Sequence, residues 1–251
     1  MMIKTSDVRI IEALSSGAAT VRWLQNNFKN EFEQNELYQR LNSLKKAGFV
    51  ESVLYNDFSG NGKSYALYVL TEHGAGFLVR EKAYEMEKIR TAIPSVHTVA
   101  HELAVTDVVR TIKRESIDLN YDLKYADEAL VKKMHAFWKI KGPQPDLLVV
   151  IDLSRAGRPD VRTFAVEVDM GTQLKVSILD KVEKMQYRTL MLCSRKPRID
   201  KLMIAFAPHE KLHSKIAFAN LHDFCTRRGG LIGTDFITPD GRKFQIRPRK
   251  N

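Results

Sequence analysis

The sequence predicts an α/β (α+β) protein that combines a small helical module with a larger mixed sheet flanked by helices. Before residue 75, segments of helical periodicity alternate with turn formers and then give way to two β-rich runs. After residue 95, apolar runs of strand length alternate with segments of helical period. The 251 residues, 44% of them hydrophobic, suffice for two cores. These observations favour two domains of different architecture.

Three short helices and a hairpin are predicted in the first module. The segments DVRIIEAL, VRWLQNNF and EFEQNELYQRLNSLKKAG have helical periodicity, and Gly48 ends the third of them. The runs FVESVLYN and KSYALYVLT flank SGNG, which carries the Asn-Gly signal of a hairpin turn. This order, with LTEHGAGFL as a closing helix, resembles a winged helix-turn-helix. We therefore assign residues 1–75 to a winged helix-turn-helix DNA-binding domain.

In such a module the third helix enters the major groove of DNA and the wing contacts the backbone. Leu37, Leu41 and Leu44 form the stripe of this helix that is predicted to be buried. The predicted DNA contacts are the polar residues off this stripe and on the wing: Gln34, Asn35, Tyr38, Gln39, Arg40, Asn42, Lys45, Lys46, Asn61 and Lys63. Because the N-terminal third is almost neutral, a solvated face in a dimerisation or scaffold module is the alternative.

Residues 76–94 are predicted to form a helical linker, because GFLVREKAYEMEKIRTAI has few turn formers before Pro94. Residues 95–251 are the second predicted domain. It begins with a helix whose apolar stripe combines His101 with Val105, Val108 and Ile112.

The rest of this domain is predicted as alternating strands and helices. YDLKYADEALVKKM, QPDLLVVIDL and RTFAVEVDM are strand-like, and VSILDKVEKMQYRTLML is helical. KLMIAFAP is then expected to be a strand and KLHSKIAFANLHDFCTR a helix, before LIGTDFIT and a polar tail. The order is thus α-β-β-β-α-β followed by additional elements.

Two carboxylates at alternate positions of one apolar strand, Glu167 and Asp169, mark the predicted site. Alternate residues of a strand share a face, and two buried like charges require a positive partner. Asp146 begins the preceding strand, and an antiparallel hairpin would bring it close to Glu167. Such oxygen ligands suit Mg²⁺ or Mn²⁺, which would polarise a phosphodiester and lower the pKa of an attacking water. A solvent-facing edge strand is the alternative.

Pro145-Asp146 followed by Glu167-x-Asp169 resembles the motif of the PD-(D/E)xK nucleases, whose core is a mixed sheet with this order of helices and strands. Asp169 stands where the usual motif has lysine, and an aspartate cannot supply its positive charge. Lys181 or Lys184 on the following helix could supply it, and Lys181 is the preferred donor. Gln173 could contact the scissile phosphate or cap the helix.

A longer set of motifs resembles a narrower family. H-x-L-x-x-x-D at residues 101–107, Pro145-Asp146, E-V-D-x-G-T at residues 167–172 and a lysine near position 181 resemble the replication-relaxation family, which includes the MobC-type plasmid mobilisation relaxases. The resemblance spans nearly the whole chain, and EVDxGT is its specific part. It implies an N-terminal winged helix joined to a PD-(D/E)xK restriction-endonuclease-like domain.

The function implied by this resemblance is that of a DNA relaxase. Such an enzyme is a metal-dependent, site- and strand-specific nickase that acts at a plasmid origin of transfer to initiate conjugative mobilisation. The implied partners are double-stranded DNA, accessory mobilisation proteins and a coupling protein. The resemblance does not name the DNA sequence, the physiological metal or the oligomeric state.

Residue roles follow from the same resemblance. Asp146, Glu167 and Asp169 would bind the Mg²⁺ or Mn²⁺ ion or flank it, and Lys181 would stabilise charge. His101, together with Asp107, would complete the catalytic site from the first helix of the domain; a core histidine is the alternative. Family members often carry a tyrosine after the helix lysine, here Tyr187, and covalent attachment to DNA stays open.

Two rival functions fit the same residues. One is a winged-helix DNA-binding regulator with a catalytically inactive nuclease-like domain, and the other is a repair or restriction endonuclease that cuts both strands. His209 to His213 satisfies HExxH, but no third zinc ligand stands at the expected spacing, so a zinc protease is not favoured. The histidine-hydrophobic-histidine relaxase signature and a Walker phosphate loop are both absent from the sequence.

The charge balance of 40 Lys+Arg against 30 Asp+Glu favours a polyanionic partner, and the excess falls in the C-terminal part. Arg227-Arg228, Arg242-Lys243 and residues 247–250 are basic segments that would contact phosphates or form a solubilising tail. Cys193 and Cys225 lack disulfide or zinc-finger spacing. With no apolar run of membrane length and no secretion signal, we expect a cytoplasmic protein without membrane insertion.

Overall fold

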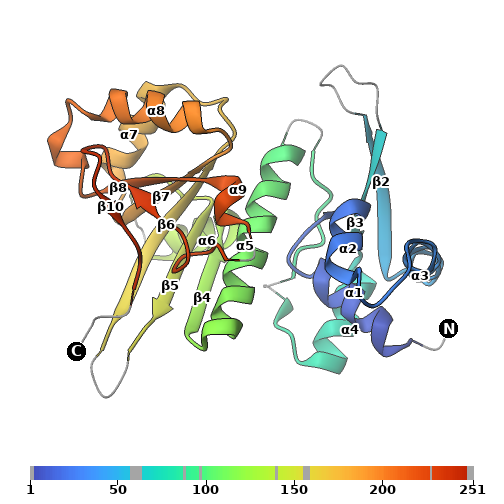
Figure 1. The fold of residues 1–251 in the computed structure, drawn as a ribbon. Coiled ribbons are helices and arrows are strands. Elements are labelled where there is room, and N and C mark those ends of the chain that lie inside the picture. The colour runs from blue at the N-terminus through green and yellow to red at the C-terminus, as the bar shows by residue number, and fades with distance from the viewer. Residues whose placement is uncertain are drawn as a thin grey trace. The chain divides into compact units, whose positions relative to one another are not determined.

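The computed structural model describes residues 3–56, 64–86, 89–95, 98–138, 141–154, 159–226 and 228–247. The chain divides into two compact units, Met1–Thr106 and Asp107–Asn251 (Figure 1). A three-stranded sheet belongs to the first unit and a seven-stranded sheet to the second. Among the described helices, none combines the length and apolar character that crossing a membrane requires.

The first unit has the element order of a winged helix. Its strands pair antiparallel in the order β1-β3-β2, so that β2 and β3 form the wing hairpin. This confirms the predicted fold of the N-terminal module. The elements are α1 (Thr5–Leu14), β1 (Ala19–Thr20), α2 (Val21–Phe28), α3 (Gln34–Lys46), β2 (Val50–Asn56), β3 (Ser64–Leu70) and α4 (Glu72–Lys82).

The core of the first unit is organised by the leucine stripe of α3. Leu37, Leu41 and Leu44 are buried and pack in one cluster with side chains of α1 and α2. At the start of α4, a Cβ at Gly74 would lie 2.2 Å from the carbonyl oxygen of Phe49. Only glycine allows this approach of helix and strand, which fixes α4 against the hairpin.

The predicted helical linker through residue 94 is wrong. α4 ends at Lys82, because Ala83 adopts a left-handed conformation with φ of 54° and donates its N–H to the carbonyl oxygen of Leu78. Residues 89–94 are not helical; Ile89 is buried in the core of the first unit, and the Arg90 N–H bonds the Ser15 carbonyl oxygen at 3.0 Å. Burial of this apolar residue outweighs the helix propensity of the segment. The first unit therefore runs to Thr106, past the predicted boundary.

The second unit is built on a mixed sheet of order β10-β9-β8-β7-β6-β5-β4. β6, β7 and β8 run parallel, and the remaining neighbours pair antiparallel. The predicted mixed sheet flanked by helices is thus confirmed. Its elements are α5 (Val99–Leu119), whose first half lies in the first unit, β4 (Asp122–Asp127), α6 (Glu128–Trp138), β5 (Leu147–Asp152), β6 (Val161–Asp169), α7 (Lys175–Lys184), β7 (Arg188–Cys193), α8 (Lys196–Phe206), β8 (Ile216–Asn220), α9 (Leu221–Phe224), β9 (Phe236–Ile237) and β10 (Lys243–Phe244).

Helices α7 and α8 cover one face of this sheet (Figure 1). Ile178 of α7 and Phe206 of α8 pack in one cluster with Met191 and Cys193 of β7. In the parallel register Glu167 lies beside Met191, and Asp169 beside Cys193. Paired residues of neighbouring strands point to the same face. The two carboxylates of β6 therefore project toward α7 and α8.

Four predicted segments have a different structure. The strand expected from Tyr121 to Met134 ends at Asp127, whose carboxylate caps α6 by accepting the Leu130 N–H at 2.9 Å. The end of the predicted helix 176–192 is strand β7, and KLMIAFAP, the predicted strand, belongs to helix α8. Strand β8 (IAFAN) interrupts the predicted helix KLHSKIAFANLHDFCTR. β7 is buried along both faces, and such a run carries no periodicity that separates strand from helix.

Candidate functional site

Asp146 and Glu167 meet where β5 begins and β6 ends. Leu147 pairs with Val166, so the antiparallel register places Asp146 opposite Glu167. One oxygen of Asp146, Oδ2, accepts the Val168 N–H at 2.7 Å. Asp146 is only 9% exposed and Glu167 2%. By register, the two buried carboxylates therefore lie side by side on neighbouring strands of the sheet.

Lys181 provides the positive charge at this point. Its Nζ lies 2.6 Å from Oε2 of Glu167, and its side chain is 24% exposed. Lys184, the alternative donor, instead pairs with Asp180 along the solvent-exposed face of α7. Lysine therefore reaches the acidic strand from the following helix, although the usual motif carries it on the strand itself.

Asp169 makes a different set of contacts. Its Oδ2 lies 2.6 Å from Nε of Arg198, and its Oδ1 accepts the Gly171 N–H at 2.8 Å. Arg198 also donates to the carbonyl oxygen of Gln173 at 2.5 Å. Both oxygens of Asp169 are engaged in holding the turn that leaves β6. Sequence reasoning missed Arg198, because it did not recognise α8, whose N-terminal turn carries this residue.

The donor set at Asp146 and Glu167 fits a divalent cation with few protein ligands. No three His, Cys, Asp or Glu side chains in the described ranges gather closely enough to hold a metal ion together. Mg²⁺ is commonly bound by one or two carboxylates, with waters and substrate phosphates completing its shell. The two carboxylates meet that requirement, whereas the engaged oxygens of Asp169 do not favour it as a third ligand.

The expected contributions of α5 stay predictions. His101 lies in the first unit, half-buried in the first turns of this helix, and Asp107 begins the second unit. Asp107 forms an ion pair with Arg110, whose Nη1 lies 3.5 Å from Oδ1 of Asp107. Burial raises the pKa of the Asp107 carboxyl, and the neighbouring Arg110 only partly opposes this shift.

Tyr187 lies away from the carboxylates. It directly precedes β7 and packs against Val131 and Leu148. Glu167 is in register with Met191 of β7. Met191 is four residues beyond Tyr187, which corresponds to about 13 Å along the strand. By register, Tyr187 therefore lies at the far end of β7 from Met191, the residue beside Glu167.

Both cysteine thiols are expected to be unreactive in the folded protein. Burial raises the pKa of Cys193 to about 12, and the Asp169 charge adds to this effect. Burial likewise raises the pKa of Cys225 to about 11. Since the thiolate is the reactive form, we expect slow labelling by a disulfide reagent at pH 8 and rapid labelling in denaturant. Rapid reaction of either thiol in the native protein would contradict the described burial.

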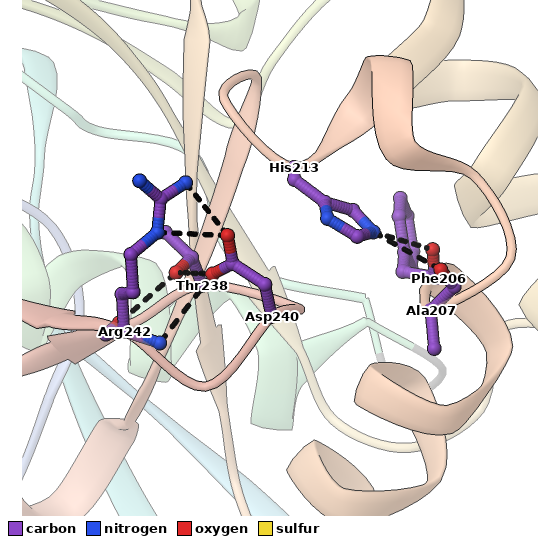
Figure 2. Close-up of polar contacts among 6 residues, drawn as sticks. All are labelled: Phe206, Ala207, His213, Thr238, Asp240 and Arg242. Atoms are coloured by element: carbon purple, nitrogen blue, oxygen red, sulfur yellow. Dashed lines mark hydrogen bonds and ion pairs between the residues drawn. The ribbon is translucent and has the colours of Figure 1, made fainter.

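The HExxH segment does not form a zinc site. Glu210–Leu212 is a single 3₁₀ turn, whereas the motif needs both histidines on one α-helical face. The His213 ring nitrogen Nε2 instead lies 3.2 Å from the carbonyl oxygens of Phe206 and Ala207 (Figure 2). The histidine thus closes the C-terminal end of α8.

In the C-terminal basic segments, Arg242 forms an ion pair with Asp240. Its guanidinium lies 2.6 Å from Oδ2 of Asp240, and Thr238 donates to the same carboxylate at 2.5 Å (Figure 2). These contacts hold the pKa of Asp240 well below its usual value. Arg227 and residues 248–250 lie outside the described residues, so their predicted contacts with phosphates stay predictions.

The predicted DNA-contacting face of α3 is largely exposed. Its exposed residues are Asn35, Tyr38, Gln39, Asn42, Lys45 and Lys46. Lys45 also donates to the Ser52 hydroxyl at 2.6 Å. Arg40 differs, because its half-buried guanidinium lies 3.6 Å from the buried Asp7 carboxylate. The Gln34 side chain, Asn61 and Lys63 lie outside the described residues.

Comparison with known proteins identifies the family. The replication-relaxation family model matches residues 15–202, three quarters of the chain. The chain belongs to the replication-relaxation family. The match covers α3 of the first unit as well as Asp146, Glu167, Asp169 and Lys181 of the second, so both predicted sites lie inside the family region.

The other comparisons add little. No match was found among curated proteins. A PadR family transcription regulator from hypervirulent Clostridium difficile R20291 is 20% identical with a TM-score of 0.28, and the match covers 31% of this chain and 82% of that one. Bacillus subtilis PadR, solved in complex with operator DNA, is 15% identical with a TM-score of 0.29. That match covers 57% of this chain and 82% of the PadR chain. TM-scores this low do not establish a shared fold.

Proposed function

We propose that this protein is a metal-dependent DNA nickase, a relaxase that opens one strand of plasmid DNA at an origin of transfer. The observation that supports the proposal is the placement of buried Asp146 opposite buried Glu167 in a mixed sheet, with Lys181 paired to Glu167. Two carboxylates and a lysine, on strands and helices in this order, are the constellation of PD-(D/E)xK nucleases. Membership of the replication-relaxation family and the winged helix support the same reading.

In this proposal each residue has a distinct part. Asp146 and Glu167 would hold a Mg²⁺ or Mn²⁺ ion, which would supply Lewis acidity toward a phosphodiester and a more acidic bound water. Lys181 would keep a positive charge beside Glu167, where negative charge develops on the phosphate during cleavage. Asp169 and Arg198 would fix the turn that follows the acidic strand.

The winged helix would select the DNA, and its exposed helix face gives a direct test. We expect the double variant Gln39→Ala/Asn42→Ala to lose at least about tenfold in affinity for a duplex selected from a random library, because each lost base contact costs about 1–3 kcal/mol. Its melting temperature should be unchanged, since both side chains are exposed. Fluorescence anisotropy and thermal unfolding provide the two measurements.

Arg40→Ala serves as the contrasting variant on the same helix. It removes the partner of the buried Asp7 carboxylate, so it should lower stability by about 1–2 kcal/mol. If the double variant keeps full affinity, α3 is not the helix that reads DNA.

The competing function is a winged-helix regulator whose second unit binds DNA without cutting it. One observation favours it: Glu167 and Asp169 are already neutralised by Lys181 and Arg198, so the acidic strand has positive partners even without a metal. In that case the second unit would act as a further clamp on the DNA.

Cleavage of supercoiled plasmid in Mn²⁺, Mg²⁺ and EDTA separates these functions. The proposal predicts an open-circular product with either metal and none in EDTA. A linear product would indicate an endonuclease that cuts both strands. Binding without cleavage in any of the metals would favour the regulator. Accessory mobilisation proteins and a coupling protein are the proposed partners at the origin of transfer.

A further inference from the structure

A polar cavity opens at the same end of the sheet as the carboxylates. Asn220, the last residue of β8, is in register with Cys193, and Cys193 is in register with Asp169. Two strand spacings separate Asn220 from Asp169, which is about 10 Å. Ligands of sheets with parallel strands bind beyond the carboxyl ends of those strands. The cavity has a volume of about 260 Å³, and its side-chain lining includes Asn220, Asp223, Arg228, Thr234 and Asp235.

The wall of this cavity is held in place by a buried glutamate. Glu115 of α5 accepts the N–H groups of Leu231, Ile232 and Gly233 at 2.8–2.9 Å, and the Tyr121 hydroxyl at 2.8 Å. Gly230 has φ of +114°, and a Cβ there would lie 2.5 Å from the Glu115 carboxyl carbon. The segment is therefore shaped before any ligand arrives, which reduces the entropy lost on binding.

Opposite charges line the cavity without pairing. Within the described part of the chain, no ion pair or side-chain hydrogen bond engages the Arg228 guanidinium or the Asp223 carboxylate. The hydroxyl of Thr234, a residue that is 6% exposed, is buried and has no hydrogen-bond partner there. Buried polar groups normally have a partner. The exposed Arg228 and Asp223 side chains and the buried Thr234 hydroxyl leave donors and acceptors available to a polar ligand.

The remaining polar groups define what kind of ligand fits. Asn220 Oδ1 accepts the N–H groups of His222 and Asp223, so its amide contributes donors only. Asp235 accepts from Gln245 at 2.5 Å and retains acceptor capacity on its second oxygen. The cavity thus offers donors from Arg228 and Asn220 and acceptors from Asp223 and Asp235. Guanine is complementary to such a lining, because O6 and N7 accept from arginine while N1–H and N2–H₂ can donate to a carboxylate.

We propose that this cavity binds a guanine base of the DNA strand that is cut, about three to four nucleotides from the scissile phosphate. Two strand spacings and two residues along β6 separate Asn220 from Glu167, which together give about 12 Å, and a DNA strand rises about 3.4 Å per nucleotide. The inference rests on the proposed nicking function for its location, but binding of the base does not depend on cleavage. It adds a reader of single-stranded sequence to the duplex reader in the first unit.

The test measures base preference in EDTA, where no metal-dependent cleavage occurs. Fluorescence anisotropy compares the affinity of the full chain for a short oligothymidine with that for the same strand carrying one central guanine, adenine or cytosine. We expect guanine to raise the affinity about tenfold, and Arg228→Ala and Asp223→Asn each to reduce this preference to within about twofold.

Arg242→Ala and Asp240→Asn are the matched controls. They remove the same charges from an ion pair outside the cavity (Figure 2). A lost phosphate contact weakens binding to every base equally, so these controls should keep the guanine preference even if overall affinity falls.

Two outcomes overturn the inference. Equal affinity for all four strands, or a guanine preference that survives both cavity variants, would remove the cavity as a base reader while leaving the nickase proposal intact. A guanine preference in a protein that cuts no plasmid would instead remove the nickase proposal and leave base binding in place.

Discussion

Replacing Glu167 by alanine is expected to reduce metal-dependent nicking of supercoiled plasmid by about a thousandfold or more. The variant loses one of two carboxylates at the site and leaves Lys181 without its partner. Removal of a single electrostatic stabiliser in other enzymes costs about a hundred- to a thousandfold, and loss of a metal ligand also lowers the occupancy of the ion. Gel analysis of open-circular product under single-turnover conditions measures the effect.

The affinity of Glu167→Ala for DNA should stay close to that of the unmodified protein, because the exposed face of α3 is unchanged. If this variant nicks plasmid at the normal rate, Glu167 is not part of the catalytic site.

Lys181→Met sharpens the same prediction. It leaves the buried Glu167 carboxylate without its counter-charge, so stability should fall by about 3 kcal/mol as well as activity. Because a divalent cation would supply the missing positive charge, excess Mn²⁺ should recover much of the lost stability. Lys184→Met is the matched control, since it removes the same charge from an exposed pair on the same helix. Equal effects of the two variants would contradict the role of Lys181.

Glu115→Ala is expected to cause the largest loss of stability, about 3–5 kcal/mol. The substitution leaves the buried N–H of Leu231, the part-buried N–H groups of Ile232 and Gly233, and the Tyr121 hydroxyl without their acceptor. Each unsatisfied buried donor costs about 1–3 kcal/mol, with partial relief from water or local rearrangement. In hydrogen exchange, the amides of residues 231–233 should lose protection, and thermal unfolding should begin at a lower temperature.

Glu183→Ala is the control for this prediction, because Glu183 is exposed on α7. Tyr121→Phe removes a single donor and should cost only about 1 kcal/mol. Unchanged protection of residues 231–233 in Glu115→Ala would show that the carboxylate does not hold this segment.

The sequence predicted the features that depend on neighbouring residues. The stripe of Leu37, Leu41 and Leu44 follows from helical periodicity, and the hairpin from its turn residues. The proximity of Asp146 and Glu167 follows from strand alternation and a hairpin between adjacent strands. Lys181, which pairs with Glu167, lies on α7, the helix that directly follows this hairpin. These relations need only local geometry and the register of two adjacent strands.

Features that depend on tertiary packing were missed. β7 and β8 are buried on both faces, so their residues show no alternation that distinguishes them from a helix. That error hid α8 and, with it, the contact of Arg198 with Asp169. The backbone N–H groups that Glu115 accepts lie more than 100 residues away in the sequence, and no spacing rule connects them. The end of α4 at Lys82 likewise depends on tertiary packing, because Ile89 is buried in the core of the first unit.

A crystal of the protein soaked in manganese and measured at the manganese absorption edge tests the central claim most directly. The account predicts one anomalous peak bound by the carboxylates of Asp146 and Glu167, and its loss in Glu167→Ala. An ion-free position between these two side chains at saturating Mn²⁺, with Lys181 still paired to Glu167, would contradict a metal-dependent nickase.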